Sequence, residues 1–121
     1  MTVFVWLGVG VLGGAGALAR FLLDGYVGEH LGGGFPWGTF AVNVSGAFAL
    51  GLVTGLALHG DALVLAGGAA LGSYTTFSTW MLESDRLVEA GQTLAAVMNV
   101  VLTLLVGLGA AELGRLLGGA L

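Results

Sequence analysis

Four long apolar stretches divide the chain, and all the charged residues except Arg20 fall between them or after the last one. Each stretch is close to the roughly 20 residues that a helix needs to cross the hydrocarbon layer of a membrane. The predicted spans are residues 2–23, 36–58, 62–82 and 90–111. Polar connectors follow at 59–61 and 83–89, and a longer glycine-rich connector covers 24–35. We therefore expect an all-α protein whose single transmembrane domain has four helices and occupies nearly all of the chain.

Composition agrees with this pattern. The chain of 121 residues is 57% hydrophobic and 8% charged, with a mean hydropathy of +1.02, whereas soluble domains carry about 25% charged residues. There is no cysteine, so neither a disulfide framework nor a thiolate metal site can form. The composition predicts an integral membrane protein and excludes a soluble domain.

The 24 glycines need an explanation, because one string of them, Gly8 to Gly13, has the GxGxxG spacing of a dinucleotide-binding loop. That loop requires a preceding strand and a surrounding βαβ unit, and here the string lies inside an apolar span. Close packing between helices is the better explanation, since small residues four apart let two backbones approach. The pairs with this spacing are Gly10 and Gly14, Gly51 and Gly55, and Gly68 and Gly72.

The basic residues give almost no preferred orientation. The chain has no lysine and three arginines, of which Arg20 and Arg86 fall on one side of a four-span topology and Arg115 on the other. Because basic residues normally mark the cytoplasmic side, such a chain can insert both ways and assemble as an antiparallel, dual-topology homodimer. The alternative is that details of insertion fix a single orientation despite the weak charge bias.

Polar residues within the spans are unusual, because burying them in a membrane is costly. Asn43 lies in the middle of the second span with Thr39 one turn before it, and Asn99 and Thr103 form a similar stripe on the fourth. These residues can line a polar pathway. Taken singly, each can also serve as a hydrogen bond between helices, worth about 1 kcal/mol.

The third span carries the densest polar cluster, a run of hydroxyl-bearing side chains between Gly72 and Thr79. Glycine and consecutive threonines predict a local break in the helix, and a break at membrane depth is tolerated only within protein or beside a cavity. Freed carbonyls there can bind a cation. Phe77 and Trp80 share a face, and their positive ring edges can attract an anion. Ordinary packing of the two rings is the alternative.

Arg20 indicates the sign of a substrate. It has apolar sequence on both sides, and no acidic residue lies near the centre of a span. A guanidinium near a span end suits an anion, whereas a cation exporter needs a carboxylate within the membrane. The alternative is that Arg20 only extends toward the lipid headgroups.

Three segments together resemble a known family, the small dual-topology fluoride channels called Fluc or CrcB. Residues 13–21 (GGAGALARF) resemble its first-helix motif and residues 38–46 (GTFAVNVSG) its second. Residues 72–83, which include Thr75-Thr76-Phe77-Ser78-Thr79, resemble the third and most specific motif. The similarity extends over essentially the whole chain, in order and in hydropathy.

This resemblance implies a passive fluoride channel of the cell inner membrane that confers fluoride resistance and is not an enzyme. It implies a homodimer of opposed subunits, with two pores and a structural Na⁺ at the dimer interface, held by the backbone carbonyls of Gly72 and Thr75. The implied ion-pathway residues are Asn43, Phe77, Trp80, Ser78, Thr79, Thr103 and Arg20. The expected partners are fluoride, membrane lipid and a second copy of the chain, with no nucleic acid.

The sequence departs from this family at two positions. Trp80 stands where the family usually has phenylalanine, and Asn99 where many members have tyrosine. Two other classes stay open: a small multidrug-type antiporter, which needs an acidic residue that the first span lacks, and a structural membrane subunit, which leaves the hydroxyl cluster unexplained. An enzyme is least favoured, because neither His30 nor His59 has a cluster of partner residues.

Overall fold

The computed structural model describes residues 2–121, and Met1, with which the first uncharged stretch begins, lies outside them. These residues form helices joined by short connectors, with no β-strand among them. The elements are α1 (Val3–Leu31), α2 (Trp37–Gly55), α3 (Asp61–Leu63), the π-helix η1 (Val64–Leu71), α4 (Gly72–Tyr74), α5 (Ser78–Glu89) and α6 (Thr93–Ala120). The prediction of an all-helical fold is confirmed.

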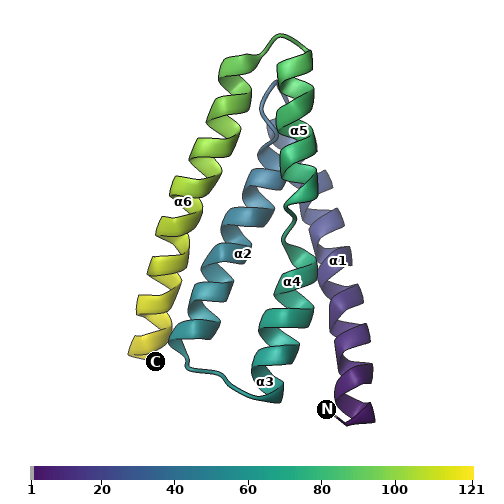
Figure 1. The fold of residues 1–121 in the computed structure, drawn as a ribbon, viewed down its shortest axis with the longest axis vertical. Helices are drawn as coiled ribbons and strands as arrows, with labels where there is room; N and C mark the ends of the chain where they lie inside the picture. The colour runs from purple at the N-terminus through teal and green to yellow at the C-terminus, as the bar shows by residue number, and fades with distance from the viewer. Residues whose placement is uncertain (1) are drawn as a thin grey trace.

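The chain passes four times along the bundle, and its two ends lie at the same end of it (Figure 1). Three helices, α1, α2 and α6, are long and apolar enough to cross a membrane. The remaining pass is assembled from α3, η1, α4 and α5, which follow one another along the bundle with an interruption between α4 and α5 (Figure 1). The predicted break in the third helix is therefore present.

Two segments predicted as connectors are mostly helical. Helix α1 continues through the glycine-rich segment to Leu31, which shortens the connector to residues 32–36. The φ angles of Gly32 and Gly33, +43° and +85°, suit glycine. The charged segment 83–89 is the end of α5, which stops before Gly91 at φ +78°. Glutamate and arginine are good helix formers, so charge alone does not end a helix.

The closest contact between helices joins α2 to α6. In four places the backbone of one helix lies against the backbone of the other: Gly51 against Ala111, Gly55 against Arg115, Gly114 against Phe48, and Gly118 against Leu52. At each of these glycines a Cβ atom would collide with the facing backbone. Each helix thus contributes two glycines one turn apart, which is the small-residue spacing that allows close approach of two helices. The predicted role of the Gly51 and Gly55 pair is confirmed.

The other predicted pairs behave differently. A Cβ atom added at Gly10, Gly14 or Gly68 would meet no atom of a neighbouring element within 4 Å among the described residues, and at Gly72 it would meet only the Gly67 carbonyl oxygen of the preceding η1, at 3.8 Å. Within one subunit these pairs do not bring helices together. Spacing alone does not reveal which helix face a glycine occupies, so the pairs could not be separated from sequence.

Two further glycines fix the helices around the interruption. Gly16 of α1 lies against the carbonyl of Ala70 and the hydroxyl of Ser73, and Gly46 of α2 lies against Thr75 and Tyr74. In both places a Cβ atom would overlap with its neighbours. The residues of the break are therefore held between α1 and α2 at positions where only glycine fits.

We expect Gly114→Ala to destabilise the subunit, because the new methyl group meets the backbone of α2, which cannot yield as a side chain would. The cost should be about 1–3 kcal/mol, as for other overpacked interiors. Gly109→Ala on the same helix is the control, since a Cβ there meets nothing within 4 Å. Unfolding of the purified protein in detergent measures the difference, and equal stability of the two variants would contradict the assignment.

Candidate functional site

The break in the third pass is formed by an extended backbone at Thr75. This residue has φ −78° and ψ 160°, which ends α4, and α5 begins at Ser78. The Thr75 hydroxyl donates to the carbonyl of Leu71 at 3.0 Å. The Thr76 hydroxyl accepts a hydrogen bond from the backbone N–H of Thr79 at 3.2 Å. The threonines thus satisfy backbone groups on both sides of the break.

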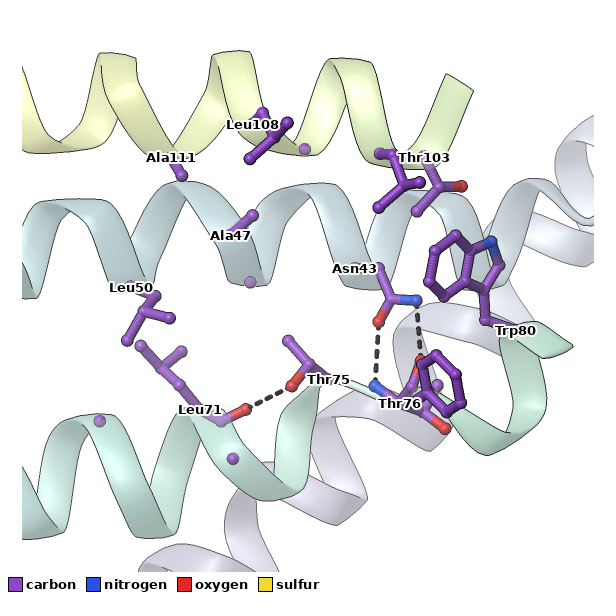
Figure 2. A pocket seen from close by; sticks show the side chains of 16 residues that line it. Asn43, Ala47, Leu50, Leu71, Thr75, Thr76, Trp80, Thr103, Leu108 and Ala111 are labelled. Atoms are coloured by element: carbon purple, nitrogen blue, oxygen red, sulfur yellow. Dashed lines mark hydrogen bonds between the residues drawn. The ribbon is translucent and has the colours of Figure 1, made fainter. Parts of the chain in front are cut away.

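Asn43 of α2 binds the backbone at the centre of the break. Its Nδ2 donates to the Thr76 carbonyl and its Oδ1 accepts from the Thr76 N–H, both at 2.9 Å. Figure 2 shows this two-way pair, with the Asn43 side chain pointing from α2 to the interrupted segment. One Nδ2 hydrogen remains after this pair, because a side-chain amide has two.

An open cavity of about 420 Å³ lies beside the break. Residues from α2, η1, α4, α5 and α6 line it, together with Thr75, Thr76 and Phe77 from the break itself. Most of the lining is apolar, and the side-chain polar groups come from Asn43, Thr75, Thr76, Trp80 and Thr103 (Figure 2). An apolar cavity with a few polar groups is the usual form of a small-ligand site.

Two aromatic rings contribute to this cavity and differ in exposure. Phe77 is 70% exposed and Trp80 is 9% exposed. Their ring centroids are 5.8 Å apart at an interplanar angle of 83°, an edge-to-face pair. The Trp80 indole Nε1 donates to the backbone carbonyl of Asn99 on α6 at 3.1 Å. This bond anchors Trp80 of α5 to α6, while the ring of Phe77 is open to the cavity.

A buried polar network supports Trp80. The Asn99 side chain is fully buried, and its Nδ2 donates to the Ser84 hydroxyl at 2.9 Å. Ser84 in turn donates to the Trp80 carbonyl at 3.0 Å. Sequence reasoning missed Ser84, because it was assigned to a charged connector. Ser84 follows Trp80 by four residues, and this spacing places the two residues on one face of a helix that continues through the segment.

The cavity unites six of the residues predicted as functional and leaves out three. Asn43, Phe77, Trp80, Thr103, Gly72 and Thr75 line it. Ser78, Thr79 and Arg20 do not. Ser78 is exposed, and Thr79 lies at the start of α5. Arg20 is half-buried, and its Nε atom has no hydrogen-bond partner within residues 2–121.

Thr39, one turn before Asn43, faces another partner. It is 2% exposed, and its hydroxyl donates to the Glu83 carboxylate of α5. Nearby, a Cβ atom at Gly38 would overlap with Asp24 of α1. Thr39 thus connects α2 to α5 toward one end of the bundle. Asn43, one turn later on the same helix, lines the cavity, whereas Thr39 does not.

The carbonyl oxygens of Gly72 and Thr75 fit the chemistry of a bound Na⁺. Among residues 2–121 neither carbonyl accepts a hydrogen bond outside the regular helices, and hard cations prefer oxygen ligands. The described residues contain no group of three or more histidine, cysteine, aspartate or glutamate side chains that could hold a metal ion. Two carbonyl oxygens from one subunit are fewer than the roughly six oxygens that a hard cation usually takes.

The helices and the cavity define a small multi-pass membrane protein whose largely apolar cavity, with a few polar groups, lies beside a broken helix. The chain belongs to the family described as CrcB-like protein, Camphor Resistance (CrcB), whose model matches residues 7–115. The resemblance found in the sequence motifs is confirmed, and with it the location in the cell membrane.

Several relatives are similar over nearly their whole length. The chain is 50% identical over 115 residues to fluoride-specific ion channel FluC 2 of Mycobacterium tuberculosis, covering 95% of this chain and 91% of that protein. It is 44% identical over 119 residues to FluC 1 of Symbiobacterium thermophilum, covering 93% and 96%. It is 47% identical over 106 residues to FluC 1 of Rubrobacter xylanophilus, covering 87% and 86%. The family is one of ion channels, and the chain is not an enzyme.

We expect Asn43→Asp to loosen the break, because a carboxylate can accept from the Thr76 N–H but cannot donate to the Thr76 carbonyl when ionised. An unsatisfied buried carbonyl costs about 1–3 kcal/mol. Amide hydrogen exchange at residues 75–77 should therefore accelerate roughly tenfold or more. Ser45→Ala is the control, since Ser45 bonds to the Tyr74 hydroxyl and not to Thr76. Unchanged exchange in Asn43→Asp would show that the pair does not hold the break.

Proposed function

We propose that this protein is a fluoride-selective channel that exports fluoride passively across the cell membrane and so confers fluoride resistance. One observation carries the proposal: the exposed Phe77 ring, Trp80, the Asn43 amide and the Thr103 hydroxyl lie around a single cavity. Three of the four passes contribute to it. The proposal is supported by relatives named fluoride-specific ion channels at 44–50% identity.

The chemistry of the cavity suits a small, strongly hydrated anion. Such an ion enters only if protein donors replace its water, and it leaves only if no single site holds it too tightly. Amide and hydroxyl hydrogens can replace water, and the positive edges of Phe77 and Trp80 attract an anion without a formal charge. Among the described residues that line the cavity, none is acidic, so no carboxylate repels an anion there or drives a cation antiporter.

Passive export is the expected direction of flow. Fluoride enters cells as the neutral weak acid HF, which dissociates inside, and the negative interior then drives the anion outward at about 2.3 kcal/mol per 100 mV. No second substrate and no chemical step are needed. Ser78, Thr79 and Arg20 lie outside the cavity lining. In this proposal they lie along the route by which the ion reaches the cavity.

The proposed assembly is an antiparallel homodimer in the lipid bilayer. Three arginines with nearly balanced placement support insertion in both orientations. The cavity is open on the subunit surface, and Gly10, Gly14 and Gly68 have free space where a second copy could approach. Two opposed subunits would offer four carbonyl oxygens from Gly72 and Thr75 to one Na⁺ at the interface, twice the number available in one subunit.

Fluoride efflux from liposomes that contain the purified protein tests the function directly. A fluoride electrode should record efflux far above that of protein-free liposomes, and chloride efflux should stay near the protein-free rate. Equal rates for the two anions, or no fluoride efflux from a well-folded sample, would exclude a fluoride-selective channel.

Phe77→Ile tests whether a ring edge replaces the water of the anion. The variant keeps apolar bulk but removes the quadrupole of the ring, so efflux per folded protein should fall close to the protein-free rate. Phe4→Ile is the matched control, because Phe4 is 83% exposed on α1 and does not line the cavity. Normal efflux from a properly assembled Phe77→Ile sample would assign the ring to packing.

The antiparallel assembly predicts that each terminus can be labelled from both sides of the membrane. Cysteines introduced near the ends of the chain should react with an impermeant reagent in intact cells for about half of the molecules, because the charge bias is close to nil. Adding lysines to the connector at 59–61 should shift the labelling to one side. Labelling of the original chain from one side alone would rule out dual topology.

A further inference from the structure

Several hydroxyl groups in or next to the helices of this protein donate to the carbonyl four residues earlier, as short polar side chains in helices commonly do. The bonds of this kind join Thr54 to Leu50, Ser73 to Ala69, Thr75 to Leu71, and Ser84 to Trp80, at 2.7–3.0 Å. Such a bond uses the only hydrogen of the hydroxyl. A threonine bonded in this way has no hydrogen left to offer to an anion.

Thr103 of α6 makes no such bond. Its side chain is 6% exposed, yet its Oγ1 has no hydrogen-bond partner among residues 2–121. The carbonyl four residues earlier belongs to Asn99. In the regular helix that carbonyl accepts the backbone N–H of Thr103, and it also accepts the Trp80 indole N–H at 3.1 Å. Both acceptor positions of the Asn99 carbonyl are thus in use.

We propose that Trp80 is a positioning residue that keeps the Thr103 hydroxyl free. By occupying the Asn99 carbonyl, the indole N–H removes the acceptor to which Thr103 would otherwise donate, so that the hydroxyl hydrogen is available to an anion in the cavity that both residues line. The inference rests on the proposed permeation of fluoride. It assigns to Trp80 a role beyond its ring edge, one that phenylalanine cannot perform.

The Asn99 side chain holds its own backbone carbonyl beside the Trp80 indole. Its Nδ2 donates to Ser84 at 2.9 Å and approaches the Trp80 carbonyl at 3.5 Å, so the same residue that offers its carbonyl to the indole also binds the backbone of α5. All three side chains of this network are at most 9% exposed. Water therefore cannot easily replace the indole at the Asn99 carbonyl.

A direct role for the indole is the competing explanation. If the Trp80 N–H left Asn99 and donated to the anion itself, its contribution would be independent of Thr103. A double-mutant cycle separates the two, because residues that act through each other do not give additive effects. The variants are Trp80→Phe, Thr103→Val and the combination of both, with Trp37→Phe as the control, since Trp37 packs on Phe35 and Phe40 away from the cavity.

Fluoride efflux per folded protein is the first measurement. Trp80→Phe and Thr103→Val should each lower it roughly tenfold or more, the factor expected for loss of one hydrogen bond to a charged group. Trp80→Phe should then cause little further loss in the Thr103→Val background, and Trp37→Phe should conduct normally. Losses that multiply in the double variant, or normal efflux in Trp80→Phe, would overturn the proposal.

Thermal unfolding in detergent is the second measurement, and it does not depend on transport. With Trp80 in place the Thr103 hydroxyl is buried without a partner, so Thr103→Val should leave the melting temperature unchanged or raise it. In the Trp80→Phe background the hydroxyl is bonded to Asn99, and Thr103→Val should lower the melting temperature. The same effect in both backgrounds would refute the coupling. If the original protein fails to conduct fluoride, the proposed function is wrong. The melting temperatures of the variants still decide whether Trp80 and Thr103 are coupled.

Discussion

The need to satisfy backbone polar groups at membrane depth controls the form of this protein. A helix broken between Tyr74 and Ser78 exposes N–H and C=O groups where no water is available. Asn43 supplies one donor and one acceptor to Thr76, and the Thr76 hydroxyl begins α5 by accepting from Thr79. The break persists because side chains from α2 and from the break itself replace the missing helical bonds, and the cavity forms beside it.

Glycine provides the second condition, because partners for the break must come close to it. Gly16 and Gly46 allow α1 and α2 to contact the residues around the break, and the glycines of α2 and α6 bring those two helices into backbone contact. Helix α2 is therefore held on both sides, which fixes the position of Asn43. In a membrane, where apolar side chains gain nothing by leaving lipid for protein, such close contact is a main source of association.

Sequence alone predicts the number of passes, the break and six of the sixteen residues that line the cavity. These follow from local signals: the length of an apolar stretch, a crowd of hydroxyls, and a polar residue at membrane depth. The extension of α1 to Leu31 and the helical end of α5 have no such local signal, because charged residues mark where an apolar span ends but do not end a helix. The partners of Thr39 and Asn99 were also out of reach, since Glu83 and Ser84 are 44 and 15 residues away along the chain.

Trp80 and Asn99, the two positions at which the sequence was expected to depart from the family it resembles, are bonded to each other in the fold. Trp80 needs an acceptor for its buried indole N–H, and the Asn99 carbonyl provides it at 3.1 Å. A large ring also needs space, and Asn99 is a compact residue whose own amide binds the backbone of α5. Phenylalanine at position 80 would leave that carbonyl with one partner fewer, and tyrosine at position 99 would place a ring where Asn99 is now fully enclosed. A change at either position therefore alters the environment of the other, and Thr103, one turn farther along α6, is affected by both.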